Sequence, residues 1–331
     1  MKSSFDLNRD KPNYGWAFDG VPEENSVCYE VKHDTFEIPA IILAQEIPEQ
    51  LLGRRIQEKF GNEFPIRFDY LDTMEGENLS LQVHPKIDFI RDNFGMTYTQ
   101  NESYYILRRG KGAVVYLGVK DGVSKTKLFD DLDRAQKKEV VFDDKKYINR
   151  FQVEKHDHYS IPAGLIHCGG KDTVILEISQ TPYIFTFKLW DWGRTGLDGQ
   201  PRPIHLKFGY DNVDINYNRS WIKKNLLNIT KTISDKPDHI EEQTGLYETE
   251  AIETRRHWFS HSIIIETHHS VNMLNLVEGD RIRIESLNDK FEPQYFNFGE
   301  TFIIPEQISR CLVTNVDTGH NVALIQAYIR N

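Results

Sequence analysis

The sequence predicts an all-β protein made of two similar β-sandwich units, and three observations support this prediction. Short segments rich in β-branched and aromatic residues alternate with Gly, Asp, Asn and Pro along most of the 331 residues, as the strands and turns of a sandwich do. Segments with helical periodicity are few. Residues 161–168 (IPAGLIHC) also have a counterpart at 304–311 (IPEQISRC), which indicates that the two halves share an architecture.

The clearest strand segments are rich in Val, Ile, Tyr and Phe and are bounded by turn residues. They are residues 103–107, 112–118, 173–178, 183–189 and 261–266. A helix is expected at 48–60, where apolar residues recur on one face before Gly61, and a weaker one at 220–228. The first forty residues match no motif, and two alternatives stay open there: a strand-rich extension packed on the first unit, or the remnant of a larger upstream region.

A linker is expected between the two units. Residues 230–245 are polar, contain Pro237 and lack periodicity, which is typical of a connecting segment. We therefore divide the chain into an N-terminal unit, residues 1–229, and a C-terminal unit, residues 230–331.

The composition excludes several classes of protein. The 50 acidic and 40 basic residues give a formal net charge of -10, so the chain lacks the positive charge that binds nucleic acids or anionic lipids. Residues 38–44, one of the longest apolar stretches, are too few to cross a bilayer, and the first eight residues lack the apolar core of a signal peptide. The cysteines, Cys28, Cys168 and Cys311, lie far apart and form no disulfide framework, so a cytoplasmic location is expected.

Four residues on three segments have the chemistry of a metal site. Gln82 and His84 alternate along the strand-like residues 79–85, so their side chains share a face. Glu102 begins the next strand, and a proline-glycine turn presents His167. Two imidazoles, a carboxylate and an amide oxygen suit Zn²⁺, Fe²⁺ or Mn²⁺. Each residue alone has a simpler structural interpretation, such as a hydrogen-bonded histidine in a strand, but the combination favours a metal site.

The segments around these residues resemble the class I mannose-6-phosphate isomerases of the cupin superfamily. The resemblance covers residues 64–72, 79–85, Glu102, 161–170, 176–180, 190–194 and 199–205, in that order. It implies two cupin-type jelly-roll units with a few short helices. It also implies that the four residues above bind one Zn²⁺ ion in the N-terminal unit. The implied activity is the interconversion of mannose 6-phosphate and fructose 6-phosphate through a cis-enediolate, with a sugar phosphate as the small-molecule partner.

The resemblance assigns two further residues to the active site. The family's active-site arginine falls on Arg194, for which the simpler interpretation is a surface ion pair with Asp191 or Asp198. Glu177 matches a glutamate of the family and suits either proton transfer or a hydrogen bond that orients a metal ligand. His158 is a rival for the proton transfer because an imidazole titrates near neutral pH.

Two lysines of the family are replaced. Gln100 stands two residues before the ligand glutamate, and Asp69 stands after the Phe-Pro segment. Lysines there would hold a phosphate or stabilise the enediolate, so the resemblance implies a divergent member, for which a related sugar stays open as the substrate. Other cations could compensate for the lysines, although the sequence places none of them in the pocket: Arg108, Arg109, Arg202 and Lys207. Two other functions stay open, a metal- or sugar-binding cupin without turnover and an iron-dependent cupin oxygenase.

The C-terminal unit is expected to lack a metal, since Arg310 stands where His167 stands in the first unit. Four histidines also occur there: His257, His261, His268 and His269. The odd spacing of His261 and His268 would place them on opposite faces of a straight strand, and no carboxylate motif accompanies the four. We therefore predict that they do not form a second metal site.

Overall fold

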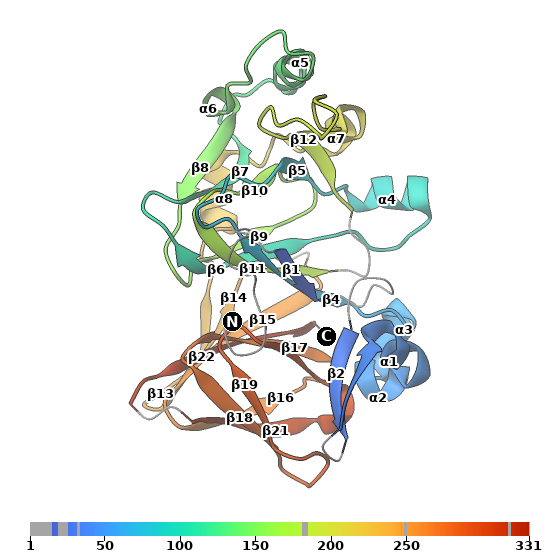
Figure 1. Cartoon of the computed structure of the whole chain (residues 1–331), viewed down its shortest axis with the longest axis vertical. Helices are drawn as coiled ribbons and strands as arrows, with labels where there is room; N and C mark the ends of the chain where they lie inside the picture. The colour runs from blue at the N-terminus through green and yellow to red at the C-terminus, as the bar shows by residue number, and fades with distance from the viewer. Residues whose placement is uncertain are drawn as a thin grey trace.

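Two β-sandwich units lie one above the other along the long axis of the computed structural model (Figure 1). The structure describes residues 15–18, 26–31, 34–180, 185–245, 247, 250–316 and 319–330. Each unit consists of two packed sheets whose neighbouring strands run antiparallel. The predicted all-β class and the two-unit architecture are therefore confirmed.

The N-terminal unit contains two five-stranded sheets. The first has the order β1 (Gly15–Phe18), β4 (Ile66–Asp72), β11 (Thr173–Gln180), β6 (Glu102–Arg109) and β9 (His158–Ile161). The second has the order β12 (Phe187–Trp190), β5 (Leu81–Val83), β10 (His167–Gly169), β7 (Val114–Val119) and β8 (Ile148–Gln152). The strand segments expected at 103–107, 112–118 and 173–178 are present as β6, β7 and β11. Residues 183–184 of another expected segment lie outside the described residues, and its later part forms β12.

The C-terminal unit contains a six-stranded and a four-stranded sheet. The larger has the order β13 (Lys231–Lys236), β14 (His239–Thr244), β15 (Ile252–Phe259), β22 (Val322–Ile329), β17 (Asn272–Glu278) and β20 (Thr301–Ile304). The smaller has the order β16 (Ser262–Glu266), β21 (Arg310–Asn315), β18 (Arg281–Ser286) and β19 (Gln294–Asn297).

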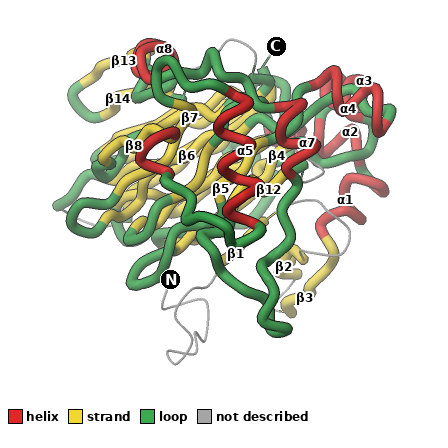
Figure 2. Tube along the Cα trace, turned by 90° about the horizontal axis from the view of Figure 1, so that it is seen from above, coloured by secondary structure: helices red, strands yellow, loops and turns green. Residues whose placement is uncertain are grey.

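The helices lie outside the sheets. They are α1 (Ala40–Glu46), α2 (Pro48–Leu52), α3 (Arg54–Phe60), α4 (Ile87–Phe94), α5 (Lys125–Gln136), α6 (Asp144–Tyr147), α7 (Leu206–Asn212), α8 (Arg219–Asn225) and a 3-10 turn η1 (Glu306–Ile308). β2 (Ser26–Val31) and β3 (Asp34–Pro39) form a separate hairpin. Seen from above, α5 and α7 lie over the N-terminal unit (Figure 2), and α8 confirms the helix expected near residues 220–228. Among the described helices, none has the length and apolar character that a membrane crossing requires.

The single helix expected at 48–60 is wrong. Gly53 has a φ of 83° and separates α2 from α3, while Gly61 ends α3 as predicted. A Cβ at Gly53 would lie 2.7 Å from the Cγ of Glu306 in η1. Glycine therefore permits both the left-handed turn and the close approach to the C-terminal unit.

The expected linker at 230–245 is also wrong. β13 and β14 form a hairpin there, and β14 pairs with β15 along its whole length. β13 lies at the sheet edge, and each of its residues is at least partly exposed. An edge strand of this kind lacks the apolar alternation that reveals a strand in a sequence.

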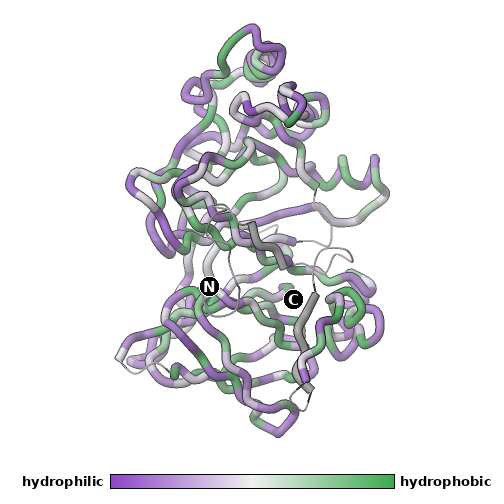
Figure 3. The backbone as a smooth tube through the Cα atoms, viewed as in Figure 1, coloured by the Kyte–Doolittle hydropathy of each residue, from purple (hydrophilic) through white to green (hydrophobic). Residues whose placement is uncertain are grey.

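The two units share one hydrophobic core. Phe68, Tyr105 and Ile178, from the first sheet of the N-terminal unit, belong to the same buried cluster as Met273 and Ile325 of the six-stranded sheet. Helices α1 to α3 lie beside the C-terminal unit (Figure 1) and contribute to this cluster. Figure 3 shows hydrophobic residues along the strands of both units. The other face of the first sheet contributes Tyr104 and Ile106 to a second buried cluster, which includes Val115 and Leu117 of the second sheet, so this face lines the interior of the N-terminal sandwich.

The two similar sequence segments, residues 161–168 and 304–311, also occupy similar places in the fold. After Ile161, the chain passes through a Pro-Gly turn from β9 in one sheet to β10 in the other. After Ile304, it passes through η1 from β20 in the six-stranded sheet to β21 in the four-stranded sheet. A turn at the corresponding position therefore joins the two sheets in each unit.

Candidate metal centre

The inner face of the N-terminal sandwich carries a cluster of polar side chains. Glu102 begins β6, and Gln82 of β5 lies directly opposite His167 of β10. His84 follows Gln82 by two residues, and the intervening Val83 is buried in the hydrophobic core behind the sheet. Backbone alternation therefore turns Gln82 and His84 toward the same side, as predicted.

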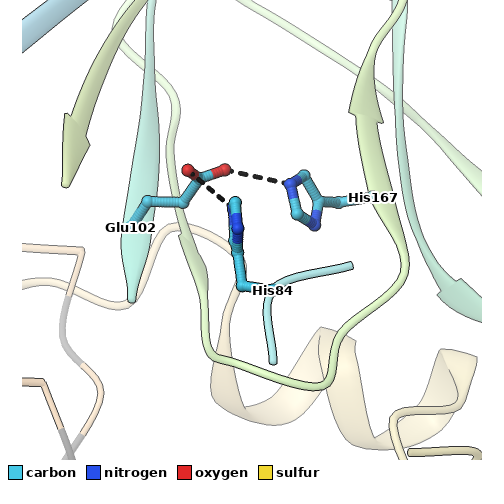
Figure 4. A group of neighbouring side chains, drawn as sticks. All are labelled: His84, Glu102 and His167. Atoms are coloured by element: carbon cyan, nitrogen blue, oxygen red, sulfur yellow. Dashed lines mark ion pairs between the residues drawn. The ribbon is translucent and has the colours of Figure 1, made fainter. Parts of the chain in front are cut away.

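The structure brings all four predicted ligands together. His84 Nε2 lies 2.9 Å from Glu102 Oε2, and His167 Nε2 lies 3.1 Å from Glu102 Oε1 (Figure 4). The two imidazole rings are 4.7 Å apart between centroids, and Gln82 Nε2 lies 3.2 Å from His167 Nε2. His84, Glu102 and His167 are buried, and one ligand atom from each lies within 4.8 Å of the others.

Backbone carbonyls determine which nitrogen of each imidazole carries the proton. His84 Nδ1 donates to the carbonyl of Phe185 at 2.8 Å, and His167 Nδ1 donates to the carbonyl of Leu165 at 2.9 Å. In the neutral ring the Nε2 atom is then unprotonated. Two nitrogen lone pairs therefore point at the carboxylate of Glu102, an arrangement that is repulsive unless a positive charge lies between them.

The hydrogen bonds within the cluster also indicate that a positive charge is missing. Among the described residues, neither His84 Nε2 nor Glu102 Oε1 has a well-aligned hydrogen bond, although both atoms are buried. Burial opposes ionisation of Glu102, but positive charge on the two imidazoles outweighs it and holds the pKa of this carboxyl well below its usual range. A bound cation supplies the same charge without protonating the rings.

The donor set fits a divalent transition metal. Two imidazole nitrogens and a carboxylate oxygen suit zinc, iron or manganese. The amide of Gln82 can present its oxygen as a fourth ligand, because a half-turn of the side chain exchanges its oxygen and nitrogen. His84, Glu102 and His167, with Gln82, therefore form a candidate metal centre.

No family model matches the chain, but individual relatives do. It is 26% identical to the mannose-6-phosphate isomerase ManA of Bacillus subtilis (strain 168) over 155 residues, which are 47% of this chain and 46% of ManA. It is 24% identical to the mannose-6-phosphate isomerase of Streptococcus mutans serotype c over 238 residues, 70% of this chain and 68% of that protein. The first alignment thus spans less than half the length of ManA.

Solved structures extend the similarity over nearly the whole chain. The mannose 6-phosphate isomerase of Bacillus subtilis has a TM-score of 0.75 at 19% identity, covering 95% of this chain and 88% of that one. A variant of the phosphomannose isomerase of Salmonella typhimurium has a TM-score of 0.72 at 13% identity, covering 99% and 93%. The chain is a divergent relative of the mannose-6-phosphate isomerases. Its fold is the cupin-like β-sandwich fold of these enzymes.

A buried arginine accompanies Asp69, which replaces one lysine of the isomerase family. Arg67 Nη2 forms an ion pair with Asp69 Oδ2, and Arg67 Nη1 lies 3.7 Å from Glu177 Oε1. Asp69 and Glu177 are directly opposite on β4 and β11. Burial raises the pKa of Glu177 well above its usual range, as do the charges of Glu102 and Asp69, while Arg67 lowers it. Sequence analysis missed Arg67, although strand alternation places it on the same face as Asp69.

Gln100, which replaces the other lysine, holds Glu102, a candidate metal ligand, in place. Its Nε2 donates to Glu102 Oε2 at 3.1 Å, and its Oε1 accepts from the backbone N–H of Phe185 at 2.9 Å. The side chain is buried. Gln100 therefore faces the candidate metal centre, and its neutral amide orients the carboxylate of Glu102.

Tyr104 extends the same inner face. It lies directly opposite Glu177 on the neighbouring strand, and its ring meets that of His167 edge-on at 6.0 Å between centroids. Burial, and secondarily the charges of Glu102 and Glu177, raise the pKa of the hydroxyl well above its usual value. The hydroxyl therefore stays protonated and can donate a hydrogen bond.

A second cation that sequence analysis missed is Lys188. It lies directly opposite Gln82 in the pairing of β12 with β5, so the two side chains leave the same face of the sheet. The four cations that the sequence offers as compensation for the lost lysines are exposed: Arg108, Arg109, Arg202 and Lys207. Only the register of the strands shows which basic residues face inward, so the sequence alone could not identify Lys188.

The structure does not bring Arg194 into the metal cluster. Its guanidinium forms an ion pair with Asp191 and lies 3.7 Å from Glu77. Two residues earlier, Trp192 packs against Tyr116, which is buried in the core behind the sheet rather than on the face of His167. Arg194 therefore adopts the ion pair with Asp191 that was the alternative interpretation.

The rival base His158 faces away from the metal centre. Its ring nitrogens hydrogen-bond to Thr244 Oγ1 at 2.9 Å and to Ser103 Oγ at 2.8 Å. Burial lowers the pKa of His158 to about 3, so the ring is neutral, and both of its nitrogens are already hydrogen-bonded. In the second unit, Arg310 is an exposed residue 3.4 Å from Glu266, which agrees with the loss of the His167 position there.

Proposed function

We propose that the protein is a metal-dependent aldose-ketose isomerase that interconverts mannose 6-phosphate and fructose 6-phosphate at one Zn²⁺ ion. The activities named for its relatives support this reaction. The observation that carries the proposal is the pair of unprotonated Nε2 atoms, from His84 and His167, that point at Glu102. Zinc bound there and by Gln82 would polarise the sugar oxygens and stabilise the negative charge of the enediolate.

The isomerisation requires removal of a proton beside a carbonyl and its return to the neighbouring carbon. We assign this transfer to the carboxyl group of Glu177, which lies on the inner face beside the candidate metal centre. Burial and the neighbouring carboxylates raise its pKa, which suits a group that both takes up and returns a proton, and Arg67, 3.7 Å away, partly offsets this rise. Tyr104, on the strand next to Glu177, is placed to donate a hydrogen bond to a substrate oxygen.

We assign the substrate's phosphate to Lys188. Arg67 is bound to Asp69 and close to Glu177, so its charge is already compensated. Lys188 leaves the same face as the predicted ligand Gln82, and it lies on the edge strand of its sheet. An ammonium group there would bind a phosphate as a point charge.

A second candidate function is a metal- or sugar-binding cupin without turnover. The observation that favours it is the excess of carboxylates over cations on the inner face. Among the residues that the structure describes there, Glu102, Glu177 and Asp69 accompany one buried arginine, Arg67. Such a surface would disfavour a phosphorylated ligand. An iron-dependent oxygenase would differ in its metal, which metal analysis identifies.

The test is conversion of mannose 6-phosphate to fructose 6-phosphate by the zinc-loaded protein, with unphosphorylated mannose assayed in parallel. Turnover of the phosphorylated sugar that is lost in Glu177→Gln, with the metal retained, supports the proposal. Bound zinc without turnover of either sugar would favour the binding protein. The proposal includes a cytoplasmic location, which the two buried free thiols of Cys168 and Cys311 support.

A further inference from the structure

A second group of metal-ligating side chains lies inside the C-terminal sandwich. Glu241 of β14 is directly opposite His257 of β15, and His239 shares the face of Glu241 because it is two residues away. One ligand atom from each of the three residues lies within 4.8 Å of the others. Phe259, two residues after His257, belongs to the hydrophobic core of this sandwich, so the group points into the interior.

Gln326 determines the protonation of His257. The amide Nε2 of Gln326 donates to the carbonyl of Glu266 at 2.8 Å and to Asn272 Oδ1 at 2.5 Å. Its Oε1 must therefore be the acceptor for His257 Nε2 at 2.9 Å. With the proton on Nε2, His257 Nδ1 carries a lone pair, and that lone pair faces His239 Nε2 at 3.1 Å.

The simplest interpretation is a hydrogen bond from His239 to His257, but this bond does not account for the carboxylate beside it. The carboxylate of Glu241 belongs to the same group, and its Oε1 accepts from Arg255 Nη1 at 2.9 Å, which leaves Oε2 to act as a ligand. The 3.1 Å between the two nitrogens is a normal hydrogen-bond length and is also compatible with the roughly 3.3 Å expected for tetrahedral zinc with bonds of about 2.0–2.1 Å.

The surroundings keep both imidazoles in the form that binds metals. Burial lowers the pKa of His257 to about 3 and also lowers that of His239, so both rings are neutral at physiological pH. The charge of Arg255 is shared between Glu241 and Glu253, which lies 2.5 Å from its Nη2. Gln326 fixes the ring of His257 as an outer hydrogen-bond partner does in metal sites.

We propose that His239, Glu241 and His257 form a second site for a divalent transition metal such as Zn²⁺. Its ligands come from two adjacent strands, so the metal joins the edge hairpin β13–β14 to the body of the six-stranded sheet. The site is separate from the candidate metal centre of the N-terminal unit, and it serves to stabilise the C-terminal unit.

The test is the zinc content of the full-length protein after removal of metals by a chelator, reloading with zinc and gel filtration. The wild type is expected to hold two zinc ions per chain, and the double variant His84→Ala/His167→Ala one. His239→Ala and Glu241→Gln should each lose one ion. His261→Ala is the matched control, since His261 is an exposed histidine of the same unit, and it should keep both.

Circular dichroism of each variant identifies any that fails to fold. Glu241, whose side chain is 20% exposed, provides the milder substitution if His239→Ala is unfolded. Zinc contents of His239→Ala and Glu241→Gln equal to that of His261→Ala would overturn the second site. A single wild-type ion that is lost in His239→Ala but kept in His84→Ala/His167→Ala would support this site and refute the catalytic one, so the two failures are distinguishable.

Discussion

The buried pair of Arg67 and Asp69 offers a sharp test of how charge is arranged on the inner face. The side chains of Arg67, Asp69 and Glu177 are only 11%, 6% and 7% exposed, so solvent screens the pair little. Replacing Arg67 by methionine would leave two buried carboxylates without their cation. Removing one partner of such a pair costs about 3–5 kcal/mol, and we expect about 3 kcal/mol because Glu177 can take up a proton.

A double-mutant cycle isolates the interaction. Asp69→Leu alone should destabilise by a similar amount, since it leaves Arg67 with the more distant Glu177. The double variant Arg67→Met/Asp69→Leu removes both charges and should cost less than the sum of the two single changes by at least about 2 kcal/mol. The free energies of unfolding are measured by urea denaturation of the metal-free protein at pH 7.

The control for this cycle is an exposed arginine in an ion pair. Arg109 and Glu154 pair at 2.6 Å, but their side chains are 38% and 68% exposed. Arg109→Met should therefore cost less than about 1 kcal/mol. If the Arg67 and Asp69 effects were additive to within about 0.5 kcal/mol, or if Arg67→Met cost no more than Arg109→Met, the buried pair would have been misassigned.

Three further predictions concern substrate binding, Arg194 and pH. Lys188→Gln should raise the KM for mannose 6-phosphate by about tenfold or more, with Lys188→Arg close to wild type; no change in KM would remove Lys188 from phosphate binding. Arg194→Ala should keep the metal and leave kcat within a few-fold, because its guanidinium is bound to Asp191; a loss of orders of magnitude would restore the role implied by the family. Burial raises the pKa of Glu250 well above its usual range. The folded state therefore keeps a proton that the unfolded state releases, so stability falls as pH rises above the ordinary pKa. Glu250→Gln should accordingly raise the urea midpoint more at pH 8 than at pH 5, and an equal effect at both would contradict this.

The clustering of the side chains in the candidate metal centre was predictable because these residues stand in motifs with a fixed order and local geometry. Alternation alone places Gln82 and His84 on one face, and the Pro-Gly turn before His167 is recognisable in the sequence. The interior strands were predictable for a related reason, since burial selects the β-branched and aromatic residues found in β6, β7 and β11.

Residues whose role depends on strand register could not be predicted. Arg67 and Lys188 resemble any other basic residue until β4 is aligned with β11 and β12 with β5. The pattern of residues 230–245 predicts a linker because an exposed edge strand carries no apolar alternation. That error also hid His239 and Glu241, so the sequence provided no carboxylate partner for His257.

The most direct test of the central claim is to measure zinc content and mannose 6-phosphate turnover on the same samples of wild type and His167→Ala. The account predicts that His167→Ala loses one zinc equivalent per chain and that its turnover falls by orders of magnitude, while circular dichroism shows a folded protein. A folded variant with the zinc content and turnover of the wild type would contradict the account.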